Sequence, residues 1–297
     1  MKVAIVGATG MIGRRLTTAL LANGDEVLAI SRRGQTVADA PGVAWDPARG
    51  PLEPAVLADV DAVVNLAGAS IGSGRWTADR KREIVDSRVV TTTRLVEAIG
   101  TTGPRTLVNA SAVGYYGEGE APVDERAPAA DDFLGETCVE WEAAALAAEA
   151  QGVRVVLLRN GVVLAREAEV LKRQVLPFKL GLGGPLGGGQ QWWSWIHIDD
   201  VTGLIRFALV HPELRGPVNA VAPHAVRQRE FAEALGHVLG RPTVLPTPRF
   251  ALRLAMGEAA AIALAGQHVV PRAATEAGYV FAYPDVEPAL RAELGDG

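Results

Sequence analysis

Three glycines near the start of the chain have the spacing of a turn that binds phosphate. The segment VGATGMIG places Gly7, Gly10 and Gly13 in a GxxGxxG pattern between an apolar run and a helical stretch. Gly7 permits a sharp turn, Gly10 lets the backbone approach a pyrophosphate, and Gly13 allows close packing of the helix on the strand. The helix N-terminus then offers free N–H groups to the phosphates. The pattern predicts a dinucleotide site that also includes Thr9, Met11 and Ile12, with a purely structural turn as the alternative.

The end of the next apolar run indicates which dinucleotide binds. An NAD site prefers an acidic residue there to hold the ribose hydroxyls, whereas this chain has Ser31, Arg32 and Arg33. A guanidinium matches a 2′-phosphate and stacks on adenine. We therefore predict NADP(H) as the cofactor, bound by Ser31 and Arg32. The alternative is that one arginine, more readily Arg33, is a solvated surface charge.

Three hydroxyl groups come where a later strand should leave the sheet beside the nicotinamide. Ser111 ends that strand, and Tyr115 and Tyr116 follow it. A serine hydroxyl can polarise a substrate carbonyl, and a tyrosine can exchange a proton with its oxygen. We take all three as catalytic candidates, with a structural role for the tyrosines as an equal alternative.

The elements that must position these residues alternate between strand and helix. Buried strands are predicted at 2–6, 26–31, 61–68, 105–111 and 153–161, with helices at 11–23, 77–99 and 137–151. Alternation of this kind predicts an α/β fold with a Rossmann-type doubly wound parallel sheet. We expect an NADP-binding domain at 1–165, to which a strand and helix around 195–220 return. Residues 166–297 then form most of a smaller substrate lobe and a C-terminal helical region.

Composition limits the remaining classes of function. The chain has 297 residues and a net charge of −5, so it lacks the basic footprint of a nucleic-acid binder. It has one cysteine, Cys138, and therefore cannot form an intrachain disulfide. No apolar run reaches the roughly 20 residues that span a bilayer. No HExxH or paired CxxC pattern predicts a metal site. We expect a cytoplasmic protein with a small-molecule substrate and neither a nucleic-acid nor a membrane partner. The oligomeric state is not indicated.

Several motifs together resemble a known family. GATGMIG, DAVVNLAG and NASAVGYYG look like an extended short-chain dehydrogenase/reductase. NLAGASI, WEAAA, RNGVVL, PFKLGLGGPLGGGQQ and SWIHIDD resemble its "epimerase family" of NADP-dependent oxidoreductases. The segment from Gly266 to Leu290 resembles the characteristic C-terminal domain of that family, whose function is unknown. The resemblance covers essentially the whole chain and implies further cofactor contacts at Leu66, Ala67, Gly68, Glu83, Arg88 and Val163.

The chain departs from the wider superfamily at the catalytic helix. There a Tyr-x-x-x-Lys pair normally supplies the proton and a cation, and Glu142 fixes the alignment. On that alignment Leu134 stands in place of the tyrosine and Cys138 in place of the lysine. We interpret Cys138 as a small buried hydrophobe. His197 is a further general-acid candidate, although a structural histidine is favoured, and Asp199 and Asp200 look like a helix N-cap.

Three functions follow from these observations. The first is an NADP(H)-dependent oxidoreductase that acts on an unknown small-molecule carbonyl or alcohol. The second is a catalytically silent NADP(H)-binding sensor or interaction protein, which the absent pair favours. The third is a non-redox epimerase or dehydratase that oxidises its substrate only transiently.

Overall fold

A seven-stranded parallel sheet forms the centre of the computed structural model, which describes residues 1–295. Its strand order is β3-β2-β1-β4-β5-β7-β11, so the direction of winding reverses between β1 and β4. This confirms the predicted Rossmann-type doubly wound sheet, in which ligands bind beyond the carboxyl ends of the strands at the reversal. The strands are β1 (Lys2–Val6), β2 (Glu26–Ser31), β3 (Gly42–Ala44), β4 (Ala62–Asn65), β5 (Thr106–Ala112), β7 (Arg154–Asn160) and β11 (Gly216–Ala220).

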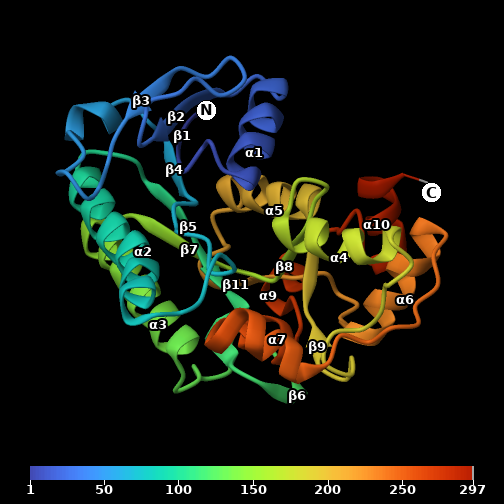
Figure 1. Cartoon of the computed structure of the whole chain (residues 1–297). Coiled ribbons are helices and arrows are strands. Elements are labelled where there is room, and N and C mark those ends of the chain that lie inside the picture. Colours follow the sequence, from blue (N-terminus) through green and yellow to red (C-terminus); the bar gives the residue numbers. More distant parts are fainter. Residues whose placement is uncertain (296–297) are drawn as a thin grey trace.

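Helices cover both faces of the sheet, which is why its strands read as continuous apolar runs. On one face, α1 (Met11–Ala22), α5 (Ile198–Val210) and the short α9 (Arg272–Glu276) share a core with the strands. On the other face lie α2 (Ala78–Ile99) and α3 (Phe133–Leu146), which pack side by side (Figure 1). No helix among the described residues is long and apolar enough to cross a membrane.

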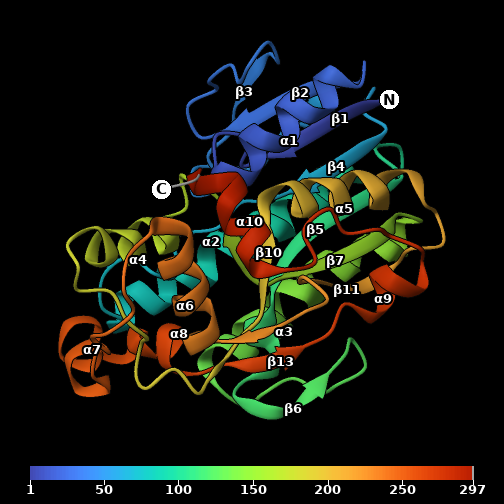
Figure 2. The ribbon, with the colours of Figure 1, turned by 90° about the vertical axis from the view of Figure 1, so that its right-hand side faces the viewer.

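The remaining elements form a smaller lobe beside the sheet, with its own apolar core (Figure 2). Its helices are α4 (Glu169–Lys179), α6 (Gln228–Leu239), α7 (Arg249–Met256), α8 (Ala261–Leu264) and α10 (Val286–Leu294). Three strand pairs connect it to the sheet domain: β8 (Val162–Leu164) with β10 (Trp195–His197), β9 (Trp192–Trp193) with β12 (Val226–Arg227), and β6 (Gly119–Val123) with β13 (Gln267–Val269). Four 3₁₀ turns complete the chain: η1 (Pro54–Leu57), η2 (Val113–Tyr116), η3 (Ala147–Gln151) and η4 (Gly257–Ala260).

Helix α3 begins four residues before its predicted start at Thr137. The side chain of Asp132 accepts hydrogen bonds from the N–H groups of Leu134 and Gly135, at 3.0 and 2.8 Å, and so caps the helix there. The helix becomes a 3₁₀ turn after Leu146. The positions aligned with the missing catalytic pair, Leu134 and Cys138, therefore both lie on α3.

Asp199 and Asp200 lie in the first turn of α5 and do not form its N-cap, which corrects that expectation. The cap is His197, whose Nδ1 accepts a hydrogen bond from the N–H of Asp199 at 3.2 Å. Buried Asp200 instead accepts hydrogen bonds from the N–H groups of Ala282 and Tyr283, at 2.8 and 2.9 Å. It also accepts one from the hydroxyl of Tyr279. The C-terminal segment 279–283, which we name the strap, is thereby held against α5 of the sheet domain.

Candidate functional site

The glycine turn brings the ends of three strands together. Gly7 has a φ of +83°, a conformation that favours glycine, and its N–H donates to the carbonyl of Ile30 at the end of β2. A Cβ on Gly7 would lie 3.0 Å from the backbone carbon of Leu66, just after β4. A Cβ on Gly13 would lie 2.5 Å from the carbonyl oxygen of Gly7. The backbone thus packs too closely for any other residue at either position.

The first turn of α1 has the features of an anion site. Gly10 is its N-cap, no side chain accepts from its free N–H groups, and its first turn contains no acidic residue. Because Gly10 lacks a side chain, these N–H groups are open to a phosphate. Arg32 is exposed one residue beyond β2, and Ser31 accepts a hydrogen bond from the N–H of Gln35 at 3.3 Å. The residues predicted to hold the adenosine half of a dinucleotide therefore lie along one edge of the sheet.

Arg88 reaches from α2 to the loop that follows β4. Its guanidinium donates to the carbonyls of Ala69 and Ile84, at 3.1 and 2.9 Å. A Cβ on Gly68 would lie 3.2 Å from its central carbon. The cation also lies 5.1 Å from the ring of Trp141 and acts electrostatically on Cys138, both on α3. Burial lowers the pKa of Arg88, but from so high a value that the group stays charged.

The position of Arg88 bears directly on the missing lysine. Cys138 packs against the end of β5, where its thiol lies 3.7 Å from the carbonyl of Ala112. Burial raises the pKa of this thiol to about 11, so it is neutral near pH 7. Arg88 nevertheless brings a positive charge to the same region from the neighbouring helix, because its guanidinium lies 5.1 Å from the ring of Trp141, which follows Cys138 on α3. The helix that should supply the cation does not, and α2 does.

Glu83 and Val163 are two further residues that the resemblance implied as cofactor contacts, and they lie on different elements. Glu83, which the resemblance implied as a cofactor contact beside Arg88, pairs with Arg80 at 2.5 Å and is 59% exposed. Val163 lies on β8, opposite Ile196 of β10, where the chain passes from the sheet to the lobe. Among the described residues no cluster of three or more His, Cys, Asp or Glu side chains has the arrangement of a metal site.

A buried polar network lies at the ends of β5 and β7. Ser111 and Arg159 are neighbours across these strands, and both contact Glu142 of α3. The Ser111 hydroxyl donates to Oε1 of Glu142 at 2.6 Å, while Arg159 binds both carboxylate oxygens, at 2.8 and 2.7 Å. All three residues are less than 7% exposed. Burial alone would lower the pKa of Arg159, but the bonds to Glu142 raise it.

The two tyrosines after Ser111 have different surroundings. Tyr116 accepts a hydrogen bond from Arg159 at 2.8 Å and donates one to Oδ1 of Asn219 at 2.7 Å. Burial raises the pKa of Tyr116 to about 12. The ring of Tyr115 lies on the guanidinium of Arg159, 3.4 Å from centroid to central carbon. Within residues 1–295 the hydroxyl of Tyr115 makes no hydrogen bond to another group of the chain.

Leu134 and His197 are both packed in place. Leu134 lies against the η2 turn. A Cβ added to Gly114 in that turn would lie 3.2 Å from the Cβ of Leu134. His197 is 1% exposed, its ring lies 3.8 Å from that of Tyr283, and its Nε2 is 3.1 Å from Glu293. Burial lowers the pKa of His197. The favoured interpretation of His197 as a structural histidine agrees with these contacts.

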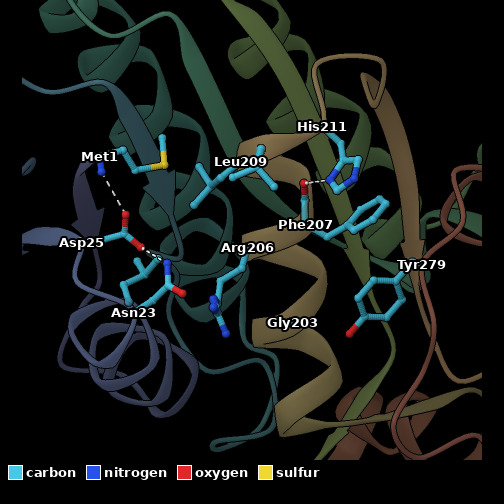
Figure 3. A pocket seen from close by; sticks show the side chains of 11 residues that line it. Met1, Asn23, Asp25, Gly203, Arg206, Phe207, Leu209, His211 and Tyr279 are labelled. Atoms are coloured by element: carbon cyan, nitrogen blue, oxygen red, sulfur yellow. Dashed lines mark hydrogen bonds and ion pairs between the residues drawn. The ribbon is translucent and has the colours of Figure 1, made fainter.

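A cavity of about 370 Å³ lies at the opposite end of the sheet, between α1 and α5 (Figure 3). Its polar groups are largely bound to one another: the amino group of Met1 and the amide of Asn23 both contact Asp25, each at 3.0 Å, and His211 contacts the carbonyl of Phe207. Because Met1 precedes β1 whereas the glycine turn follows it, this cavity is separate from the predicted dinucleotide site.

The sequence interpretation missed two members of the buried network, Arg159 and Asn219. Arg159 follows an apolar run in VRVVLLRNG, and a charged residue so close to a buried strand was an available signal. Asn219 lies in β11, which pairs with β7 although part of the lobe sequence separates the two strands along the chain. Nothing local marks it as a partner of Tyr116, because 103 residues separate the two.

Comparisons with known proteins agree with this geometry. The NAD dependent epimerase/dehydratase family matches residues 3–221, and a domain of unknown function, DUF1731, matches residues 247–293. An epimerase family protein of Mycobacterium leprae is 43% identical over 97% of this chain and 94% of its own length. The human epimerase family protein SDR39U1 is 38% identical over 98% of this chain and 99% of its own.

Solved structures extend the likeness to the whole fold. A crystal structure of the human protein SDR39U1 (isoform 2) with NADPH has a TM-score of 0.89 and 36% identity, covering 99% of both chains. A UDP-glucuronic acid 4-epimerase from Bacillus cereus, with NAD, has a TM-score of 0.78 but 20% identity over 99% of this chain and 95% of its own, so it supports the fold alone. The chain therefore belongs to the NAD-dependent epimerase/dehydratase family, with the extended short-chain dehydrogenase/reductase fold and the DUF1731 domain at its C-terminal end.

Proposed function

We propose that the chain is an NADP(H)-dependent oxidoreductase that acts on a small-molecule carbonyl or alcohol. The observation that carries this proposal is Arg88, which brings a permanent cation to the site where Cys138 replaces the usual lysine. In the superfamily that lysine tunes the catalytic tyrosine and holds the ribose. A site that had lost all need for the cation would not require a partly buried guanidinium there.

The cofactor choice has independent support. Gly10 leaves the N-terminus of α1 without a side-chain cap, as the approach of a phosphate requires, and Arg32 is exposed just after the end of β2. A relative with 36% identity over nearly its whole length was crystallised with NADPH. When bound, NADPH supplies a hydride to a carbonyl carbon. The protein has to hold the substrate oxygen and deliver a proton to it.

Tyr115 is the residue that we assign to proton transfer. Its hydroxyl is uncommitted, whereas Tyr116 is bound to both Arg159 and Asn219. The guanidinium beneath the ring of Tyr115 fixes the ring's position. The hydroxyl of Ser111, the third catalytic candidate, donates a hydrogen bond to Glu142. We therefore assign Ser111 a positioning role instead. Because the reduction is reversible, the same groups serve alcohol oxidation.

The test is a matched pair of variants in an NADPH oxidation assay with a panel of aldehydes, ketones and quinones. We expect Tyr115→Phe to lower kcat by about 10²–10⁴-fold, the usual contribution of a general acid. Tyr116→Phe should change kcat by less than about tenfold and act mainly on stability, by about 1 kcal/mol. Equal effects of the two substitutions would contradict the assignment.

The sensor function remains the second candidate, because Leu134 and Cys138 occupy the positions of the usual pair. It predicts tight NADPH binding with no oxidation of NADPH by any member of the panel. One carbonyl compound that is turned over, with loss of turnover in Tyr115→Phe, excludes it. Turnover with no net change in NADPH indicates the epimerase or dehydratase reaction instead.

A further inference from the structure

One face of the smaller lobe is both apolar and basic. Six large apolar side chains there are each more than half exposed, and we call them, with the basic residues among them, the lobe patch. They come from the end of α4, the loop after it, the segment before α7, and α7 itself: Leu176, Leu180, Leu182, Val244, Phe250 and Leu254. Single exposed apolar residues are ordinary on soluble proteins, but a group of this size marks an interaction surface.

Backbone contacts join the segments that carry the lobe patch. The carbonyl of Gly183 accepts hydrogen bonds from the N–H groups of both Val244 and Leu245, each at 3.0 Å. The N–H of Gly187 donates to the carbonyl of Thr247 at 2.8 Å, next to the start of α7. The loop after α4 and the segment before α7 therefore run side by side. In Figure 2, α7 lies at the outer edge of the lobe, with α4 on the same side of the molecule.

Helix α7 exposes its most apolar side chains to solvent. Phe250 and Leu254 are one helical turn apart and each is 73% exposed, and no residue of α7 is buried. Arg249 and Arg253 precede them and are exposed as well. A short helix gains most of its stability by packing its apolar face. The outward apolar face of α7 therefore lacks the partner that such a helix normally has.

The charge of the lobe patch is the opposite of that of the whole protein. The chain has a net charge of −5, but segments 176–182 and 241–254 contain no Asp or Glu. They contain four of its 29 basic residues: Lys179, Arg241, Arg249 and Arg253. Within residues 1–295 none of these four forms an ion pair, whereas Arg75, Lys81 and Arg173 beside them contact a carboxylate or a carbonyl. The charge of the patch is thus available to an external anion.

We propose that the lobe patch binds the surface of an anionic lipid bilayer. Apolar side chains that enter the acyl boundary, with arginines beside them at the phosphate level, are the features of a helix that lies in the membrane interface. The apolar residues come from several separate segments, which suits a deformable lipid surface better than a groove of fixed shape. A second copy of this chain is disfavoured, because a symmetric contact would bring like charges together. No spanning helix is needed, although the proposal departs from the sequence-based expectation of no membrane partner.

Vesicle flotation of the full-length chain tests the proposal. We expect binding to vesicles of mixed phosphatidylcholine and phosphatidylglycerol, weaker binding as salt increases, and little binding to phosphatidylcholine alone. Phe250→Ser with Leu254→Ser, and separately Arg249→Glu with Arg253→Glu, should each weaken binding by about tenfold or more. Val280→Ser removes an 85% exposed apolar residue elsewhere and should have no effect. Equal binding to both kinds of vesicle, no binding to either, or unchanged binding of the variants would overturn the proposal.

The single cysteine permits a direct measurement of contact. Cys138 is 4% exposed, so a cysteine introduced at the exposed Ala255 of α7 can be labelled selectively with a polarity-sensitive dye. We expect its emission to shift to the blue on addition of anionic vesicles, and the same label introduced at Val280 not to shift. NADPH titration of the labelled protein checks that it is folded. A shift that depends on protein concentration, and not on lipid, would indicate self-association and would also overturn the proposal.

Discussion

The glycine turn and the α3 face of the site are built in opposite ways. At the turn, three glycines close in sequence give the backbone room, and no side chain takes part in the close approach. On α3, Cys138 and Glu142 depend on side chains from α2, β5 and β7, far away in the chain. The first region depends on local sequence, and the second depends on what tertiary structure places against a helix. If Arg88 stands for the missing lysine as we propose, the difference teaches that a catalytic charge can be supplied by another element of the fold.

The largest effect should come from breaking the network on the α3 face. Glu142→Ala leaves the buried guanidinium of Arg159 without its carboxylate, so we expect a loss of about 3–5 kcal/mol in the free energy of unfolding. Urea denaturation measures it. Glu140→Ala, on the exposed side of the same helix, should change the value by less than about 0.5 kcal/mol. Similar losses in both variants would show that the network is not the source of the stability of this face.

A charge swap tests whether Arg88 stands for the missing lysine. Cys138→Lys places an ammonium beside the Arg88 guanidinium in a buried site, and we expect a loss of about 3 kcal/mol, limited by deprotonation of the new amine. Adding Arg88→Leu removes the repulsion and should recover at least half of that loss. NADPH affinity should recover in parallel, since one cation is again present. If the double variant recovers neither the free energy of unfolding nor the NADPH affinity, Arg88 does not stand for the missing lysine.

The turn region should respond through affinity rather than stability. If Arg32 binds the 2′-phosphate as predicted, Arg32→Glu removes a charge-assisted contact worth about 1.5–3 kcal/mol, so NADPH affinity should fall by about 10–100-fold. NADH affinity, measured by the same calorimetric titration, should stay within about threefold. Arg33→Glu is the neighbouring control and should affect NADPH less. If both cofactors weaken equally, the arginine does not read the phosphate.

The smallest effect should come from Cys138 itself. Its raised pKa keeps the thiol protonated until the pH rises towards about 11, so alkylation by iodoacetamide at pH 8 should be negligible in the folded protein and rapid in urea. Cys138→Ala should cost about 1 kcal/mol of stability. NADPH affinity and turnover of Cys138→Ala should match those of the unmodified chain. A loss of turnover would restore a chemical role for the thiol.

The sequence predicts the sheet and the turn well, because their signals are local. The apolar runs at 2–6 and 26–31 coincide with β1 and β2, and the glycine spacing requires the close approaches seen at Gly7 and Gly13. Glu142 also aligned Leu134 and Cys138 with the missing pair, although the helix predicted from Thr137 did not include Leu134. Arg88 was named only as an implied cofactor contact, and its approach to α3 could not be predicted, since it depends on how α2 packs on α3.

Strand pairs of the lobe were missed for the same reason. β6 and β13 are separated by more than a hundred residues, and each is too short to show a pattern of its own. The strap was placed in the lobe region, although its hydrogen bonds to Asp200 hold it against the sheet domain. As a local pattern, the aspartates of SWIHIDD fit two roles: the N-cap of a helix, or a buried carboxylate that binds a distant segment. Only the packed chain distinguishes them.

The strap has a consequence for the order in which the protein is made. Asp200 is buried in α5, and among residues 1–295 the donors to its carboxylate oxygens come from residues 279–283. While the chain emerges from the ribosome, the nucleotide domain carries an unsatisfied carboxylate and an uncovered face until almost the last residues are synthesised. Truncation before the strap should therefore unfold the sheet domain, although the strands and long helices of that domain all precede the strap in the chain. The strap, which lies in the DUF1731 match, is thus bonded to a helix of the epimerase match.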